Sequence, residues 1–104
     1  MNTYRTSNGE RITKAKIDRN IRKAKEIKYN SCAAVRCETC GAFHFDNTID
    51  NSHIISVKYA QETGRSELSW SQDNIIYQCR KCHIELENKG NIERENIYQK
   101  RKKQ

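Results

Sequence analysis

Two Cys-x-x-Cys pairs, Cys37/Cys40 and Cys79/Cys82, constrain the fold of this 104-residue chain more than any other feature. Each pair places two thiolates on one tight turn, and two such turns supply the four sulfur ligands of a closed tetrahedral zinc site. The alternative is a pair of disulfides. No apolar stretch near Met1 resembles a signal peptide, so we expect a cytoplasmic chain whose thiols stay reduced and hold a structural Zn²⁺.

The composition makes this metal important for folding. The chain has room for one domain, and only 35% of its residues are hydrophobic while 32% are charged. So small a core is marginal by surface-to-volume scaling, and zinc binding supplies on the order of 10 kcal/mol in small zinc peptides. We therefore expect chelation to unfold at least the central part. The fifth cysteine, Cys32, has no partner at this spacing and is expected to pack as a small apolar side chain.

The charge balance predicts a polyanionic partner. Twenty Lys and Arg residues stand against thirteen Asp and Glu residues, which gives a formal net charge of +7 and a pI near 9.3. Nucleic acid fits such a chain, because phosphate neutralisation by Lys and Arg supplies most sequence-independent affinity. An anionic membrane surface is disfavoured, because the chain has neither a transmembrane run nor a helix that combines a basic face with the large Trp, Phe and Leu side chains of interfacial helices.

A basic amphipathic helix is predicted over residues 13–29. Ile17, Ile21 and Ala24 recur with a period near 3.6, Thr13 can cap the start, and a break at residues 7–9 precedes it. The outer face is either an ordinary solvated surface or a phosphate-binding surface, for which Arg22 and Lys25 are candidates. Seven basic residues lie in the helix: Lys14, Lys16, Arg19, Arg22, Lys23, Lys25 and Lys28.

Two β-branched runs, one directly after His53 and the other directly after Asn74, predict a hairpin in the middle of the chain. The polar segment between them, residues 58–73, is expected to form its loop. Trp70 is assigned to the core, because a small domain needs its few large apolar side chains inside. The two runs consist of Ile54, Ile55 and Val57 and of Ile75, Ile76 and Tyr77.

Helical spacing returns after the second cysteine pair. His83, Leu86 and Glu87 recur at helical intervals until Gly90 ends the helix. A second short helix is expected at residues 92–100, before a frayed basic end at residues 100–103. These elements predict an α+β fold in three parts: a basic helical extension (1–30), a zinc-bound core (31–90), and a short helix with a basic tail (91–104).

The segment from Cys37 to Asn88, about half of the chain, resembles an HNH endonuclease of the ββα-metal class and is similar to small phage HNH nucleases. The resemblance implies a small zinc-stabilised ββα-metal finger, here preceded by the basic helix, that cleaves double-stranded DNA. The combination of motifs is far more specific than any one of them. In order, they are Cys37-Glu-Thr-Cys40, Ser52-His53-Ile54-Ile55, Asp73-Asn74-Ile75 and Cys79-Arg-Lys-Cys82-His83.

The resemblance implies a role for each of three residues. His53 matches the general base that activates water, and an ordinary imidazole is mostly neutral at physiological pH. Asn74 matches the asparagine that holds the histidine-bearing loop in position. His83 matches a ligand of the catalytic Mg²⁺, Mn²⁺ or Ni²⁺. Singly, these residues could be a core histidine, a turn former and a further zinc ligand, but together with the zinc frame they favour the nuclease roles.

Ser52 departs from the family pattern, because the residue before the catalytic histidine is usually Asp or His and completes the metal site. Glu87 lies four residues after His83 on the same helix face and is the favoured substitute, with Asp50 second. His44 is expected to pack or cap near the first cysteine pair. Without a substitute ligand, catalysis would be slow or would prefer Mn²⁺ or Ni²⁺.

The remaining candidates are DNA contacts. Arg80 and Lys81 lie between the second pair of zinc ligands, and Lys58 and Arg65 lie in the predicted loop, from which they could approach a groove. The chain shows no separate specificity domain. We therefore expect nicking, or double-strand cleavage by a homodimer. Any sequence specificity is expected to come from a phage or host DNA-processing partner.

Two other classes of function stay open. A non-catalytic zinc-stabilised DNA-binding module would explain the basic helix and Ser52, but the 38 residues between Cys40 and Cys79 exceed the spacing of simple four-cysteine fingers. A protein-interaction module would use zinc only for folding and engage an acidic partner. Salt-sensitive DNA binding without base preference would argue against that third class.

Overall fold

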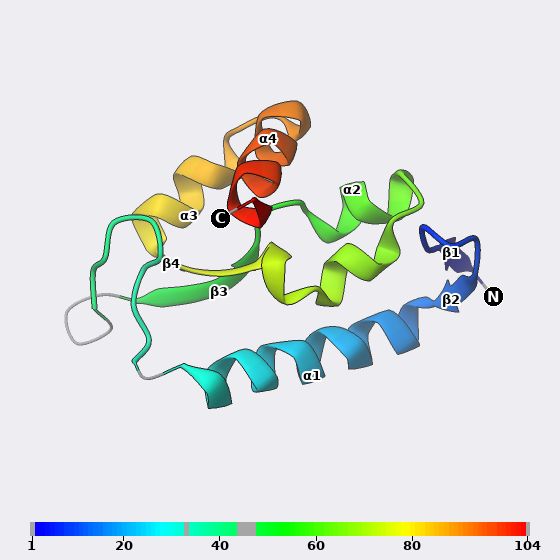
Figure 1. Cartoon of the computed structure of the whole chain (residues 1–104), viewed down its shortest axis with the longest axis horizontal. Helices are drawn as coiled ribbons and strands as arrows, with labels where there is room; N and C mark the ends of the chain where they lie inside the picture. The colour runs from blue at the N-terminus through cyan, green and yellow to red at the C-terminus, as the bar shows by residue number, and fades with distance from the viewer. Residues whose placement is uncertain (1, 33, 44–47, 104) are drawn as a thin grey trace.

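The computed structural model describes residues 2–32, 34–43 and 48–103, and these form an α+β fold, as predicted (Figure 1). Two separate antiparallel sheets have two strands each. Two 3₁₀ helices, η1 and η2, lie between α2 and β4. The elements are β1 (Thr3–Arg5), β2 (Arg11–Thr13), α1 (Lys14–Ser31), β3 (Ile49–His53), α2 (Val57–Glu62), η1 (Ser66–Trp70), η2 (Gln72–Asn74), β4 (Ile75–Cys79), α3 (Arg80–Glu87) and α4 (Asn91–Lys102).

The β3–β4 ribbon is the centre of the molecule, with α1 on one side and α3 and α4 on the other (Figure 1). Its register pairs Ile49 with Cys79 at one end and His53 with Ile75 at the other. Successive strand residues point to opposite faces, so Asp50 and His53 lie on opposite faces of the ribbon.

The predicted position of the first strand is wrong. β3 ends at His53, whereas the strand was expected to begin after it. Ile54 and Ile55 instead turn out of the ribbon and enter the main core with Ala60 and Tyr98. The apolar run is therefore buried because it crosses the core in a turn, and the polar segment before it is a strand because it pairs with the fully buried β4.

The predicted loop at residues 58–73 is also wrong, since α2, η1 and η2 fill it. The hydroxyl of Ser56 caps α2 by accepting a hydrogen bond from the backbone N–H of Tyr59 (3.1 Å). Trp70, expected in the core, is only half-buried and lines a groove along α1 beside Ala24 and Ile27.

The basic helix forms close to where it was predicted. Thr13 caps α1 by accepting from the backbone N–H of Lys16 (3.3 Å), and Ile17 and Ala24 are buried. The break before it has more structure than expected, since it is the tip of the β1–β2 hairpin, where Gly9 has a φ of +88°. The N-terminal part is therefore a hairpin followed by a helix.

The basic C-terminal end, expected to fray, is helical as far as Lys102. Arg101 explains this, because its guanidinium donates to the carboxylate of Glu38 (3.0 Å) and to the carbonyl of Ile75 (3.3 Å). These contacts fasten the last turn of α4 to the rest of the fold.

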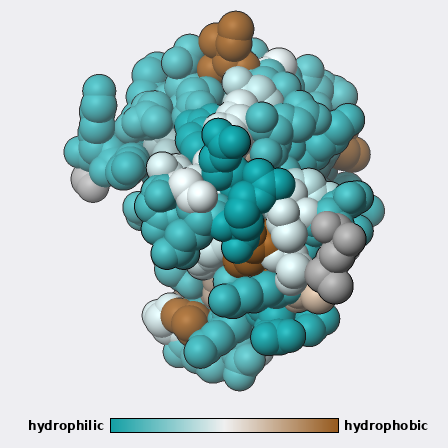
Figure 2. Space-filling model, turned by 90° about the vertical axis from the view of Figure 1, so that its right-hand side faces the viewer, coloured by the Kyte–Doolittle hydropathy of each residue, from teal (hydrophilic) through white to brown (hydrophobic). Residues whose placement is uncertain are grey.

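The surface agrees with the polar composition. The face shown in Figure 2 is mostly hydrophilic, and its apolar residues are isolated from one another. No described helix has both the length and the apolar character that a membrane span requires.

Candidate metal centre and active site

The four paired cysteines form one cluster, in which all sulfur atoms lie within 4.8 Å of one another. The Sγ atoms of Cys40 and Cys79 are 3.7 Å apart. A tetrahedral ion with metal–sulfur bonds of about 2.3 Å requires a separation of about 3.8 Å. The thiols are free, so the alternative of two disulfides does not describe this fold. Within the described ranges, no other group of three or more His, Cys, Asp or Glu residues is placed to hold a metal ion.

Local backbone geometry brings the thiols together. The carbonyl of Cys37 accepts from the backbone N–H of Gly41 (2.8 Å), and the Sγ of Cys37 accepts from the backbone N–H of Cys40 (3.4 Å). Gly41 has a φ of +83°, which a side chain would strain. The second pair meets because β4 ends at Cys79 and passes directly into α3, whose first turn carries Cys82.

The thiols differ in acidity. Burial raises the pKa of Cys37, but backbone N–H groups of Cys40, Cys79 and Thr39 outweigh it and lower the pKa to about 6. Burial and the neighbouring thiols raise the pKa of Cys82 well above its ordinary value. In this arrangement Cys37 is therefore a more acidic thiol than Cys82.

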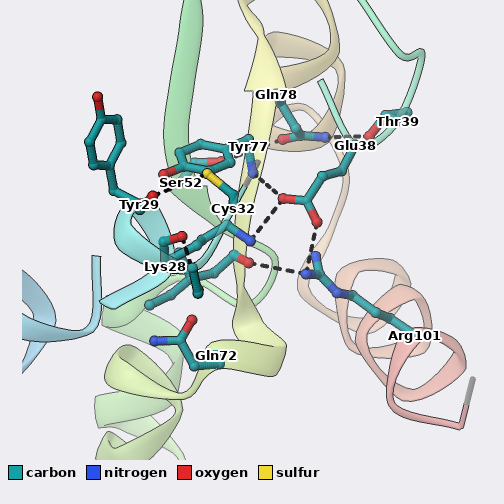
Figure 3. A network of polar contacts seen from close by, with 12 residues as sticks. Lys28, Tyr29, Cys32, Glu38, Thr39, Ser52, Gln72, Tyr77, Gln78 and Arg101 are labelled. Atoms are coloured by element: carbon teal, nitrogen blue, oxygen red, sulfur yellow. Dashed lines mark hydrogen bonds and ion pairs between the residues drawn. The ribbon is translucent and has the colours of Figure 1, made fainter. Parts of the chain in front are cut away.

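Glu38, inside the first cysteine pair, fastens this centre to three elements (Figure 3). It exchanges two hydrogen bonds with the backbone of Tyr77 in β4, at 2.8 and 2.6 Å. Its other contacts are an ion pair with Lys28 of α1 and one with Arg101 of α4, both at 3.0 Å. Glu38 therefore connects the cysteine cluster to the C-terminal end of α1 and to the last turn of α4.

His53 is held in one orientation. Its Nε2 lies 2.8 Å from the carbonyl oxygen of Ser69. A carbonyl only accepts hydrogen bonds, so the neutral ring donates from Nε2 and keeps its lone pair on Nδ1. Burial lowers the pKa of His53 below the ordinary 6.5; the Ser69 bond opposes this, and the charges of Lys25 and Arg94 add to it. The ring is therefore neutral near pH 7, with a proton-accepting nitrogen.

Asn74 lies fully buried behind His53. Its side-chain oxygen accepts from the backbone N–H of Ile55 (2.7 Å), and its amide donates to the carbonyls of Ile55 (2.9 Å) and Leu68 (3.0 Å). Its own carbonyl accepts from the N–H of Ile54 (3.0 Å). Asn74 therefore fixes the turn that follows His53.

His83 lies in a chain of charged groups on the opposite side of the ribbon. Its Nδ1 is 2.9 Å from an oxygen of Asp50, and its Nε2 is 2.9 Å from an oxygen of Glu87. The hydrogen bond with His83 lowers the pKa of Asp50. Arg80 lowers it further, because its guanidinium donates to both carboxylate oxygens of Asp50, at 2.9 and 3.1 Å. Both proposed substitutes for Ser52 therefore reach His83, but at opposite ring nitrogens, so one ion can take His83 with either carboxylate and not with both.

Ser52 itself is buried and has a structural contact. Its hydroxyl donates to the side-chain oxygen of Gln78 (3.4 Å), whose amide donates to the hydroxyl of Thr39 (3.0 Å), as Figure 3 shows. Ser52 thus helps to join the ribbon to the first cysteine pair.

The two histidines have separate surroundings. His53 lies against η1, and the positive charges of Lys25 and Arg94 act on its ring. His83 lies on α3 between the carboxylates of Asp50 and Glu87. Among the described residues, no hydrogen bond or ion pair joins the two rings.

The predicted DNA contacts divide into engaged and accessible side chains. Arg65 is engaged by Glu95 (2.6 Å), and Arg80 is engaged by Asp50. Lys58 reaches Glu62 only at 3.9 Å and is 87% exposed. Accessible or partly accessible positions are Arg22 and Lys25 on α1 and Lys81 on α3. His44 lies outside the described residues.

The sequence analysis did not identify two residues that hold this region together, Glu38 and Arg94. Arg94 is 7% exposed and donates to the carbonyls of His53 (2.9 Å) and Ile54 (2.7 Å). A signal for Arg94 was present, because it lies four residues before the buried Tyr98 on the inner face of α4. Glu38 had no signal beyond its place between two cysteines.

Comparison with known proteins gives no family assignment: no family model, curated protein or solved structure matches the chain. Its function must therefore be inferred from its own residues and their geometry.

Replacement of Glu38 by Ala should lower the free energy of unfolding by about 1–3 kcal/mol, because a charged group loses partners in three elements. Urea unfolding at matched metal content measures this. The exposed Glu85→Ala on α3 is the control, and an equal loss in both variants would contradict the role given to Glu38.

When the reduced, metal-free chain is titrated with Co²⁺, the visible bands of a tetrahedral four-thiolate site and a gain of helical circular dichroism should both saturate at one ion per chain. Cys79→Ser should lose both signals, and Asp50→Asn should keep them. Saturation that needs Asp50, or a folded metal-free chain, would contradict this assignment.

Proposed function

We propose that the chain is a metal-dependent HNH endonuclease, a hydrolase that cuts phosphodiester bonds of double-stranded DNA with His53 as general base. The observation that carries the proposal is the setting of His53. Its Nε2 donates to the Ser69 carbonyl, its Nδ1 keeps the lone pair in that tautomer with no hydrogen bond to any residue that the structure describes, and burial favours the neutral ring. A general base requires this combination of a fixed orientation and a deprotonated nitrogen.

The fold around His53 supports the same interpretation. An antiparallel ribbon leads directly into a helix, and the cysteine cluster lies at their junction, as in a ββα-metal finger formed by β3, β4 and α3. In this proposal α2, η1 and η2 are an insertion within the finger. Four thiolates favour structural Zn²⁺, and a reducing, cytoplasmic location would keep them available.

The chain's own residues suggest how hydrolysis proceeds. Nδ1 of His53 takes a proton from the water that attacks phosphorus, and the Asn74 hydrogen bonds keep the His53 segment from moving. Lys25, close enough to affect His53 electrostatically, stabilises the approaching phosphate. Arg22 and Lys81 extend the contact with the DNA backbone.

A second ion completes the proposal. His83 with Glu87 or Asp50 would hold Mg²⁺, Mn²⁺ or Ni²⁺ on the side of the ribbon opposite His53, where the ion when bound would neutralise phosphate charge of the DNA. A site of one imidazole and one carboxylate suits Mn²⁺ or Ni²⁺ better than Mg²⁺, which prefers oxygen ligands. One such centre nicks one strand, so double-strand cleavage would require a homodimer or a DNA-processing partner.

One observation favours a second candidate, a non-catalytic zinc-stabilised DNA-binding module. The ring of His83 forms hydrogen bonds with the carboxylates of Asp50 and Glu87, and the guanidinium of Arg80 donates to the carboxylate of Asp50 as well. In this alternative, the basic face of α1 binds DNA and the His83 chain only stabilises α3.

Replacement of His53 by Ala should slow conversion of supercoiled plasmid to nicked and linear forms by about 10²–10⁴-fold, with little change in DNA affinity. The assay uses zinc-loaded protein with added Mg²⁺, Mn²⁺ or Ni²⁺, and the exposed Glu93→Gln is the matched control. DNA binding without cleavage by the wild type in every metal would establish the non-catalytic module instead.

Cleavage by the wild type should lose rate as the pH falls through a value below 6.5, because protonation removes the lone pair of His53. Above that value the neutral form predominates, and this base should no longer limit the rate. Initial nicking rates between pH 5 and pH 8, at verified zinc content, measure the profile. An acid limb well above 6.5 would contradict a base with a lowered pKa.

A further inference from the structure

Arg94 of α4 contacts the peptide groups that carry His53. Its Nε donates to the carbonyl of Ile54 (2.7 Å), and its Nη2 donates to the carbonyl of His53 (2.9 Å). These are consecutive carbonyls, and Asn74 holds the N–H groups of Ile54 and Ile55 from the other direction. Arg94 of α4 thus holds two carbonyls of the turn after His53, and Asn74 holds the N–H groups of Ile54 and Ile55 and the carbonyl of Ile55.

The guanidinium of Arg94 has an unusual setting for a charge. It is 7% exposed, and within the described ranges it forms no ion pair with a carboxylate. Burial lowers the pKa of Arg94, and only the more distant charge of Glu87 opposes this. Because desolvating a cation is costly, hydrogen bonds to two neutral carbonyls alone do not explain why a charge is used here.

His53 supplies an explanation. The charged groups that act on its ring from the surrounding elements are Lys25 of α1 and Arg94 of α4, and both are positive, while η1 contributes the neutral carbonyl of Ser69. Lys25 has the larger electrostatic effect on the ring and is partly exposed, whereas Arg94 is buried and is fixed by its hydrogen bonds to the carbonyls of His53 and Ile54.

We propose that Arg94 is a positioning residue for His53, which holds the two carbonyls of the His53 turn and places a fixed positive charge behind the ring. This charge opposes protonation of the ring before DNA binds. The kinetic consequences rest on the proposed nuclease function, whereas the state of the ring does not.

The position of α4 connects this role to the metal centre. Arg101, seven residues after Arg94 on the same helix, is paired with Glu38 inside the first cysteine pair. The four-cysteine cluster therefore places α4 through Glu38, and α4 places Arg94 against His53.

The first test is the titration of the His53 ring by NMR in zinc-loaded, full-length protein. The chain has three histidines, and the spectrum of His53→Ala identifies the signal of His53. Arg94→Gln, which keeps a donor but removes the charge, should shift the midpoint upward toward 6.5. Arg94→Lys should leave it near the wild-type value, as should Lys100→Gln, an exposed charge removal on the same helix.

The second test is cleavage per folded molecule at saturating DNA. Both Arg94 variants should be slower by about ten- to a hundredfold with unchanged DNA affinity, because neither holds both carbonyls in the wild-type geometry. In the His53→Ala background, Arg94→Lys should have no further effect. If Arg94→Gln does not fold, Arg94→Lys alone decides, since wild-type cleavage by that variant would overturn the proposal.

An unshifted midpoint in folded Arg94→Gln would overturn the proposal and leave Arg94 as a structural residue. If the wild type does not cut DNA, the nuclease function fails, but the ring titration still decides whether Arg94 controls the state of His53.

Discussion

The four-cysteine cluster is the constraint on which the rest of this structure depends. Only 35% of the chain is hydrophobic, and the main core is built around a few residues such as Ile54, Ile55 and Ile76. The cluster joins segments 37–40 and 79–82, and an ion bound there would close a long loop. Glu38 spreads this constraint, because one carboxylate inside the cluster contacts α1, β4 and α4.

The two histidines of the proposed site depend on this frame in different ways. His83 follows Cys82 directly, so its backbone is placed by the cluster itself, and its ring is held by Asp50 and Glu87. His53 lies at the far end of the ribbon, where Ser69, Asn74 and Arg94 surround its turn. The cysteine cluster is connected to His53 through the pairing of β3 with β4 and through α4. A change in the packing of α4 would therefore reach His53 through Arg94.

The sequence predicted what local patterns control. The spacing of the cysteines predicted their cluster, the apolar period predicted α1, and helical spacing predicted α3. It failed where distant residues decide: the apolar run after His53 looked like a strand, but contacts with Asn74 and the core make it a turn. The spacing of Arg94 from Tyr98 signalled its burial, but the partners of Arg94 could not be predicted because they lie 40 to 41 positions away. For Glu38, Lys28 lies ten positions away, but Tyr77 and Arg101 lie 39 and 63 positions away.

The most direct measurement of the central claim is chemical rescue of His53→Ala. If His53 is the general base, removing its partly buried ring leaves space for a small base, so free imidazole should restore plasmid nicking in the variant in proportion to the neutral imidazole present. The same imidazole should leave wild-type cleavage unchanged. Rescue would show that the reaction needs a base at the position of the His53 ring, which the cysteine cluster, Asn74 and Arg94 hold in place. Cleavage by His53→Ala at the wild-type rate, or a folded, DNA-bound variant that imidazole does not restore, would contradict the account.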